Sequence, residues 1–186
     1  PIIGRQTIDV VRFLAERLRG KGIQHMNSTA TGGGVAEILT RMVPFLNELG
    51  LPTRWDVIRG GETFFQITKS LHNALHGQPM ALTAAHYRIF LETNAQNAKE
   101  LSLDGDVIFV HDPQPAALIK ERPNHKARWI WRCHIDVSQP QAVAWRFIKK
   151  FVSQYDAAIF SAPHFAQQLP IRQFQIAPSI DPLSDK

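Results

Sequence analysis

Cysteine and long apolar stretches are scarce in this 186-residue sequence. The single cysteine, Cys133, excludes an intrachain disulfide framework and a zinc site built on paired thiolates. No uninterrupted apolar run approaches the roughly 20 residues that a membrane-spanning helix needs, and the first five residues do not have the layout of a signal peptide. We therefore expect a cytoplasmic protein that makes no membrane contact and whose core is stabilised by packing alone.

Composition and charge are those of an ordinary globular domain. With 44% hydrophobic and 20% charged residues, the chain is neither disordered nor of low complexity. A chain of this length buries roughly 70% of the surface that it exposes when unfolded, which is enough for one core and one domain. The net charge of +5 is scattered along the sequence, which indicates a solvated surface rather than a nucleic-acid patch. A modest positive excess also suits an anionic small-molecule substrate.

Short apolar runs alternate with helical patterns along the whole chain. We expect strands over residues 22–28, 53–58, 106–110, 127–131, 157–160 and 174–177. We expect helices over residues 8–18, 35–49, 62–75 and 82–101, and helix-like segments over 115–122, 141–155 and 164–169. Pro44 should kink the second helix. This alternation predicts an α/β fold with a doubly wound, mainly parallel, Rossmann-like sheet covered on both faces.

Gly32, Gly33 and Gly34 lie between the first predicted strand and the helix that begins at Val35. Glycines let the backbone approach an anion closely, and the start of a helix offers unpaired N–H groups and the positive end of the dipole. The loop lacks the Lys-Ser/Thr of a P-loop, and Glu37 replaces the third glycine of a dinucleotide fingerprint. We favour phosphate binding over a tight turn without a ligand.

Two predicted strands end in histidine and aspartate. His111 and Asp112 follow one strand, and His134 and Asp136 follow the next, at the edge where open α/β sheets bind ligands. Each has a structural alternative, since Asp112 could cap a helix near residue 115 and His134 could be a satisfied buried side chain. Alternation along the strand places Cys133 opposite His134, which argues against a Cys-His nucleophilic pair.

Lys69, His72 and Asn73 share one polar face of the third predicted helix, where a solvated surface is an equally good interpretation. A Gly-x-Ser-x-Gly elbow, a metal-spaced histidine pair and a facing carboxylate pair are all lacking. Hydrolase and metalloenzyme functions therefore have little support.

Five segments, taken in chain order, make the sequence resemble the amino-terminal domain of trehalose synthases of the glycosyltransferring type. They are residues 27–29 running into 32–37, 68–69 with 72–75, 111–115, 131–136 and 178–184. The family consists of retaining glycosyltransferases of family 4 with the GT-B arrangement, in which two Rossmann-like domains face each other across a cleft. The carboxyl-terminal domain mainly holds the nucleotide-sugar donor, and the amino-terminal domain supplies the acceptor pocket and a glycine loop near the donor diphosphate.

The resemblance implies that residues 1–186 are the acceptor-side domain of an enzyme that joins glucose from a nucleoside diphosphate glucose to free glucose, giving trehalose. The donor domain is absent from this sequence, so we expect the chain alone to be inactive. No metal or cofactor is implied. The donor base, UDP or ADP, and the formation of a homodimer stay open.

The resemblance also suggests roles for residues. The family has a histidine that touches the donor sugar at the position of His134, and an aspartate at the acceptor at the position of Asp112, which makes these two the catalytic candidates. Gly32, Gly33 and Gly34 would steady the leaving diphosphate. Lys69, His72, Asn73 and Asp136 are further candidates for substrate binding.

Three other functions remain as alternatives. A trehalose phosphorylase of the same family would use inorganic phosphate, and a stand-alone module would bind a sugar and regulate. A dinucleotide oxidoreductase would need an acidic residue at the tip of the second strand, whereas Asp56 lies within that strand.

Overall fold

The computed structural model describes residues 4–178. Its centre is a six-stranded sheet in the order β2-β1-β3-β4-β5-β6, and every neighbouring pair is parallel. The strands are β1 (Ile23–Asn27), β2 (Thr53–Val57), β3 (Val107–His111), β4 (Arg128–Cys133), β5 (Ala157–Phe160) and β6 (Arg172–Gln175). The predicted doubly wound α/β fold is confirmed.

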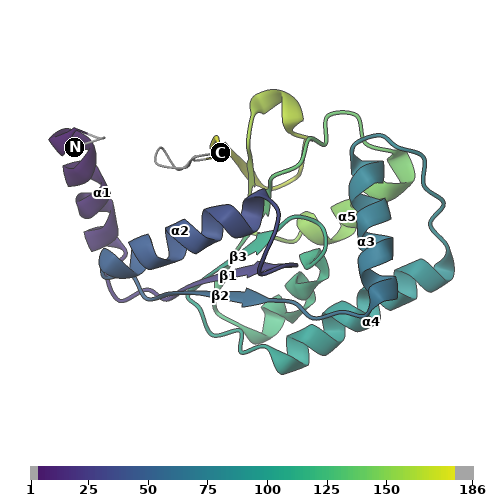
Figure 1. The fold of residues 1–186 in the computed structure, drawn as a ribbon, viewed down its shortest axis with the longest axis horizontal. Helices are drawn as coiled ribbons and strands as arrows, with labels where there is room; N and C mark the ends of the chain where they lie inside the picture. The colour runs from purple at the N-terminus through teal and green to yellow at the C-terminus, as the bar shows by residue number, and fades with distance from the viewer. Residues whose placement is uncertain (1–3, 179–186) are drawn as a thin grey trace.

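Helices cover both faces of this sheet (Figure 1). In that view α2 lies above the strands and α4 lies below them, while α1 stands apart at the left. The α-helices are α1 (Arg5–Arg17), α2 (Gly34–Glu48), α3 (Glu62–Leu75), α4 (Ala84–Glu100) and α5 (Ala142–Val152), and the 3-10 helices are η1 (Ala116–Asn124) and η2 (Pro163–Phe165). Among the described residues, no helix combines the length and the apolar composition that crossing a bilayer requires.

The main core lies on the face covered by α3, α4, α5 and η1. Alternation along β4 turns Trp129, Trp131 and Cys133 to this face, where all three are fully buried. A smaller cluster on the face of α2 joins Ala15, Ile23 and Leu51. The face covered by α3, α4, α5 and η1 therefore holds most of the apolar core, and the face of α2, with its smaller cluster, has room for buried polar side chains.

The predicted elements differ from the observed ones mainly near prolines. The helix-like segment expected over residues 164–169 forms only in part, because the 3-10 helix η2 covers Pro163–Phe165 and residues 166–169, which lead to Pro170, are not helical. The segment after Pro115 is a 3-10 helix that contains Pro123. Helix α2 runs through Pro44 without ending.

The strand order also fixes where a ligand can bind. The chain passes from β1 to β2 on one side and then returns to β3 on the other side of β1. In open parallel sheets, this reversal opens a crevice at the carboxyl ends of the two diverging strands. The carboxyl ends of β1 and β3 are therefore the expected site.

Candidate functional site

The glycine loop follows β1 and leads directly into α2. Gly32 and Gly33 have φ angles of +72° and +88°, a region that side chains with a β-carbon rarely adopt. A β-carbon on Gly32, Gly33 or Gly34 would meet nothing within 4 Å, so backbone conformation and not crowding requires glycine at the first two positions. No side chain caps the start of α2 at Gly33. The loop is exposed, so an anion can reach the first N–H groups of the helix.

Asp112 is fixed in an unusual backbone conformation just after β3. Its φ is +62°, which aspartate tolerates better than most residues. The backbone N–H of Asp112 donates to the carbonyl of Arg132 at 2.9 Å, and its carbonyl accepts the Trp131 indole N–H at 2.9 Å. Because both backbone groups are held by β4, the carboxylate is aimed along the edge of the sheet.

The Asp112 side chain links the end of β3 to the end of β4. Its Oδ1 atom accepts the backbone N–H of His134 at 2.8 Å. Helix η1 instead has Pro115 at its N-cap without a side-chain bond, so the interpretation of Asp112 as a helix cap is wrong. Burial raises the pKa of the Asp112 carboxyl to about 6, and the His134 N–H acts in the opposite direction. A carboxyl with this pKa exchanges a proton near neutral pH.

Three histidines form a hydrogen-bonded row across β1, β3 and the end of β4. His25 Nδ1 lies 3.0 Å from His111 Nε2, and His111 Nδ1 lies 2.8 Å from His134 Nε2. His25 and His111 are buried, and His134 is half-buried. Burial lowers the pKa of His25 to about 4, and burial together with the charge of Arg132 lowers that of His134 to about 4. The row is therefore neutral at physiological pH.

The carboxyl ends of β1, β3 and β4, with the glycine loop, Asp112 and His134, form the rim of the candidate site, and Arg132 brings a positive charge beneath this rim. Its guanidinium donates to the carbonyls of Phe160 at 3.3 Å and Ile176 at 2.6 Å. The side chain is largely buried and pairs with no carboxylate among residues 4–178, although its charge acts on His111, His134 and Asp112. A buried cation at this edge suits an anionic ligand.

Asp136 and the end of α3 form a second polar group next to the rim. The Asp136 carboxylate accepts the backbone N–H of Ser138 at 2.8 Å, and its pKa is lowered by Ser138 and further by His76 and His164. The backbone N–H of Gln141 donates to the Ala74 carbonyl at 2.8 Å, which ties this loop to α3.

The predicted residues of α3 differ in their surroundings. His72 and Asn73 are half-buried near the tied end of the helix, and the His72 and His76 rings are 5.0 Å apart. Lys69 is exposed and has no ion pair or side-chain hydrogen bond within the described part of the chain. The structure thus brings Asp136 to the end of α3 and gives no contact that joins Lys69 to the rim.

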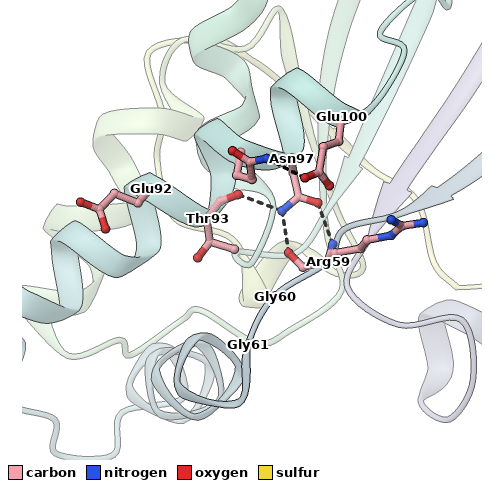
Figure 2. A pocket seen from close by; sticks show the side chains of 8 residues that line it. Arg59, Gly60, Gly61, Glu92, Thr93, Asn97 and Glu100 are labelled. Atoms are coloured by element: carbon pink, nitrogen blue, oxygen red, sulfur yellow. Dashed lines mark hydrogen bonds between the residues drawn. The ribbon is translucent and has the colours of Figure 1, made fainter.

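A surface hollow of about 620 Å³ lies elsewhere, between α4 and the loop after β2 (Figure 2). Asn97 closes one side of it, because its side chain accepts from the backbone N–H of Arg59 and donates to the Arg59 carbonyl, both at 2.6 Å. None of the predicted site residues lines this hollow. Within residues 4–178, no three His, Cys, Asp or Glu side chains are grouped so that they could hold a metal ion.

Comparison with known families decides what kind of domain this is. Residues 25–167 match a family model described as the N-terminal domain of trehalose synthase. The chain belongs to this family. Trehalose synthases of Pyrococcus horikoshii and Rubrobacter xylanophilus are 45% and 40% identical to the whole of this chain, which spans 45% and 46% of their lengths. The chain therefore spans about half the length of these relatives.

Two more distant likenesses are informative. A trehalose phosphorylase of Pleurotus pulmonarius is 29% identical over 78% of this chain and 23% of its own length. A crystal structure titled as an α,α-trehalose-phosphate synthase (UDP-forming) from Burkholderia vietnamiensis superposes with a TM-score of 0.53 at 16% identity, covering 79% of this chain and 42% of that one. This likeness supports the fold alone, which is one half of the GT-B arrangement.

Within this trehalose synthase domain, local sequence patterns indicated the residues at the carboxyl ends of β3 and β4 but not two buried side chains that lie beneath them. His25 lies in the middle of β1 and Arg132 within β4, and neither position carries a local signal. Their contacts arise only from the order of the strands. Of the five segments that carry the resemblance, residues 179–184 of the last one lie outside the described residues.

Proposed function

We propose that this domain forms the acceptor side of a retaining glycosyltransferase that makes trehalose from a nucleoside diphosphate glucose and free glucose. One observation carries the proposal: the Asp112 carboxylate and the His134 backbone are hydrogen-bonded at 2.8 Å where two adjacent parallel strands end. The glycine loop follows the carboxyl end of β1, which pairs with β3. Together with membership of the trehalose synthase family, this supports a sugar-transferring cleft at this edge.

Each part of the rim has a proposed task. In the reaction, the bond between the anomeric carbon and the diphosphate oxygen breaks, and a hydroxyl oxygen of the acceptor glucose bonds to that carbon. Asp112 accepts a hydrogen bond from this hydroxyl, and its proton passes to the carboxylate or to the leaving diphosphate. The N–H groups at Gly33, Gly34 and the first turn of α2 stabilise the charge that grows on the diphosphate.

In this proposal neutral His134 contacts the donor sugar, and His72, Asn73 and Asp136 bind the acceptor. Lys69 is the weakest of the proposed acceptor contacts, because it is exposed. The proposed reaction requires neither a metal ion nor a cofactor. A second domain would bind the nucleotide, which agrees with the share of its relatives that this chain spans. The cytoplasmic location and the homodimer remain predictions from the sequence.

Trehalose phosphorylase is the second candidate, because relatives with that name match most of this chain. The same rim would then bind inorganic phosphate beside the glycine loop. A dinucleotide oxidoreductase is disfavoured further, since Oδ2 of Asp56 already accepts hydrogen bonds from Gln24 at 2.7 Å and Arg54 at 3.0 Å.

A product assay separates these candidates. The protein that joins this domain to its donor-binding domain is incubated with UDP-glucose or ADP-glucose and glucose, and separately with trehalose and phosphate. We expect trehalose and a nucleoside diphosphate in equal amounts without added phosphate. Release of glucose 1-phosphate from trehalose and phosphate, with no use of nucleotide sugars, would contradict the synthase and support the phosphorylase.

Variants at the rim then test the assignment. Asp112→Asn and His134→Ala should each lower the rate of trehalose formation by about 100-fold or more, the usual scale for a group that assists proton transfer or positions a reacting sugar. The matched control Asp9→Asn changes an exposed aspartate of α1 and should leave the rate unchanged. Near-normal rates in both rim variants would remove these residues from the mechanism.

A further inference from the structure

The row of imidazoles has a direction, because it begins at a buried end and finishes at an open one. His25, in β1, is stacked against the Phe109 ring at 4.9 Å, deep on the face that α2 covers. His111 ends β3, and His134 follows β4 at the rim, with these two rings stacked at 5.1 Å. One histidine in β1, one at the end of β3 and one just after β4 therefore connect the interior to the proposed sugar site.

Each nitrogen–nitrogen contact in the row needs one hydrogen. A neutral imidazole has one N–H donor and one acceptor nitrogen, so three neutral rings can be linked in only two ways. Either all three carry hydrogen on Nδ1, or all three carry it on Nε2. The rings are neutral because burial opposes their charged form, and Arg132 adds a like charge near His111 and His134. The tautomers of the three histidines are therefore coupled.

The buried end decides between the two arrangements. His25 Nε2 is buried and has no hydrogen-bond partner among the described residues. With hydrogen on Nε2, a buried N–H would lack an acceptor. With hydrogen on Nδ1, the same atom presents only an unpaired lone pair. Among backbone groups, buried N–H donors without a partner are rarer than acceptors without one, and the same preference applied to these rings favours hydrogen on Nδ1 in all three.

At the open end, this choice determines what the site offers to a ligand. His134 Nε2 accepts from His111, which leaves His134 Nδ1 as the free position of the ring. This nitrogen has no bond to any described residue and is not among the buried unpartnered atoms. It can therefore reach a ligand.

We propose that His25 and His111 are positioning residues that hold His134 in the tautomer with hydrogen on Nδ1, so that this nitrogen donates to an oxygen of the ligand and cannot accept from it. The identity of that ligand oxygen, on a sugar hydroxyl or a diphosphate, rests on the proposed function. The tautomers themselves do not depend on it. The row cannot carry protons through the domain, since its inner end is closed.

The test reads the tautomers directly. Long-range 1H–15N correlation spectra of the histidine-labelled chain distinguish protonated from bare ring nitrogens, and assignment uses single His variants. We expect His25, His111 and His134 all to have hydrogen on Nδ1. Hydrogen on Nε2 of His134 in the unmodified chain would overturn the proposal.

Variants of the buried end test the coupling. His25→Leu removes the donor to His111, so the His111 and His134 tautomers should become mixed. His25→Asn places an amide nitrogen where Nδ1 was and should restore the original His134 signals. Phe109→Leu is the matched control, because it removes the ring stacked on His25 but no nitrogen of the row. A His134 tautomer that is unchanged in His25→Leu, in a chain that keeps its native circular dichroism, would also overturn the proposal.

Kinetics with the donor-binding domain present show whether the tautomer matters. In metal sites, partners that orient a histidine through its second ring nitrogen are typically worth about tenfold or more in activity, and we expect a similar scale here. We expect His25→Leu to lower kcat about tenfold, His25→Asn to recover most of this loss, and Phe109→Leu to leave kcat near the original value. A mixed tautomer with an unchanged kcat would refute the positioning role. If the unmodified protein forms no trehalose, the proposed function fails while the spectroscopic result stands.

Discussion

Acidification should destabilise this domain well above the pH at which its exposed carboxylates become protonated. The pKa of His25 and that of His134 both fall from 6.5 to about 4 on folding, chiefly through burial. Unfolded chains therefore bind protons between pH 6.5 and 4 that the folded domain cannot bind. By proton linkage, the free energy of unfolding must decrease as the pH falls through this window.

The size of the effect follows from these shifts. Each histidine shift corresponds to roughly 3 kcal/mol, and the partial exposure of His134 reduces its share. Asp112 acts in the opposite direction by a similar amount, because its pKa is raised from 3.8 to about 6 and its folded form gains a proton first. The lowered pKa of His111 makes the free energy of unfolding decrease further on acidification. The free energy of unfolding should therefore fall by on the order of 3 kcal/mol between pH 7 and 4, which is a large part of the usual stability of a domain.

Urea unfolding at several pH values measures this loss. The fluorescence of the buried Trp129 and Trp131 reports the transition. With a urea dependence of about 2 kcal/mol/M, the midpoint should fall by roughly 1.5 M between pH 7 and 4. The fall should be clearly smaller in His25→Leu. Asp104, Asp106 and Asp136 have lowered pKa values, so their contribution is lost only below about pH 4. A midpoint that is constant or rises between pH 7 and 4.5 would refute the reasoning.

Two further predictions separate the glycine loop from the surface hollow. Gly33→Ala should lower the free energy of unfolding by about 1–2 kcal/mol, because φ is +88° there while the added β-carbon meets no atom. Gly34→Ala, whose φ is not positive, should lower it by less. Equal losses of unfolding free energy in urea would contradict the claim that backbone strain at Gly33 is the cause. Asn97→Ala should lower the free energy of unfolding by about 2–3 kcal/mol, because it leaves the backbone N–H and carbonyl of Arg59 unpaired. The rate of trehalose formation per folded molecule should change little. Loss of this rate in a variant of unchanged stability would indicate that the hollow is the site.

Much of the fold follows from local patterns. The observed bounds of α3 and β5 are those predicted, because Gly60 and Gly61 precede a clear helical stripe and Ala157–Phe160 is a short, wholly apolar run. The helix-like segment predicted over residues 164–169 is confirmed only up to Phe165, because Pro163 and Pro170 flank this short segment. Boundaries of β4 and β6 shifted by about two residues, since pairing with neighbouring strands and not local sequence sets where a strand ends.

The candidate site was predictable only as far as chain order allows. Parallel strands share one carboxyl edge, so the ends of β3 and β4 had to bring Asp112 near His134. His25 has no such signal, because its partner is determined by the register of β1 against β3. The positive φ of Asp112 likewise depends on its bonds to Arg132 and Trp131.

The binding of glucose to this domain is the sharpest test of whether the acceptor site lies at the ends of β3 and β4. In a titration followed by amide NMR signals at high glucose concentration, we predict shifts at Asp112, His134 and Asp136, and weak or no response to a nucleoside diphosphate. Shifts confined to Arg59 and Asn97, or no change at the ends of β3 and β4, would contradict it.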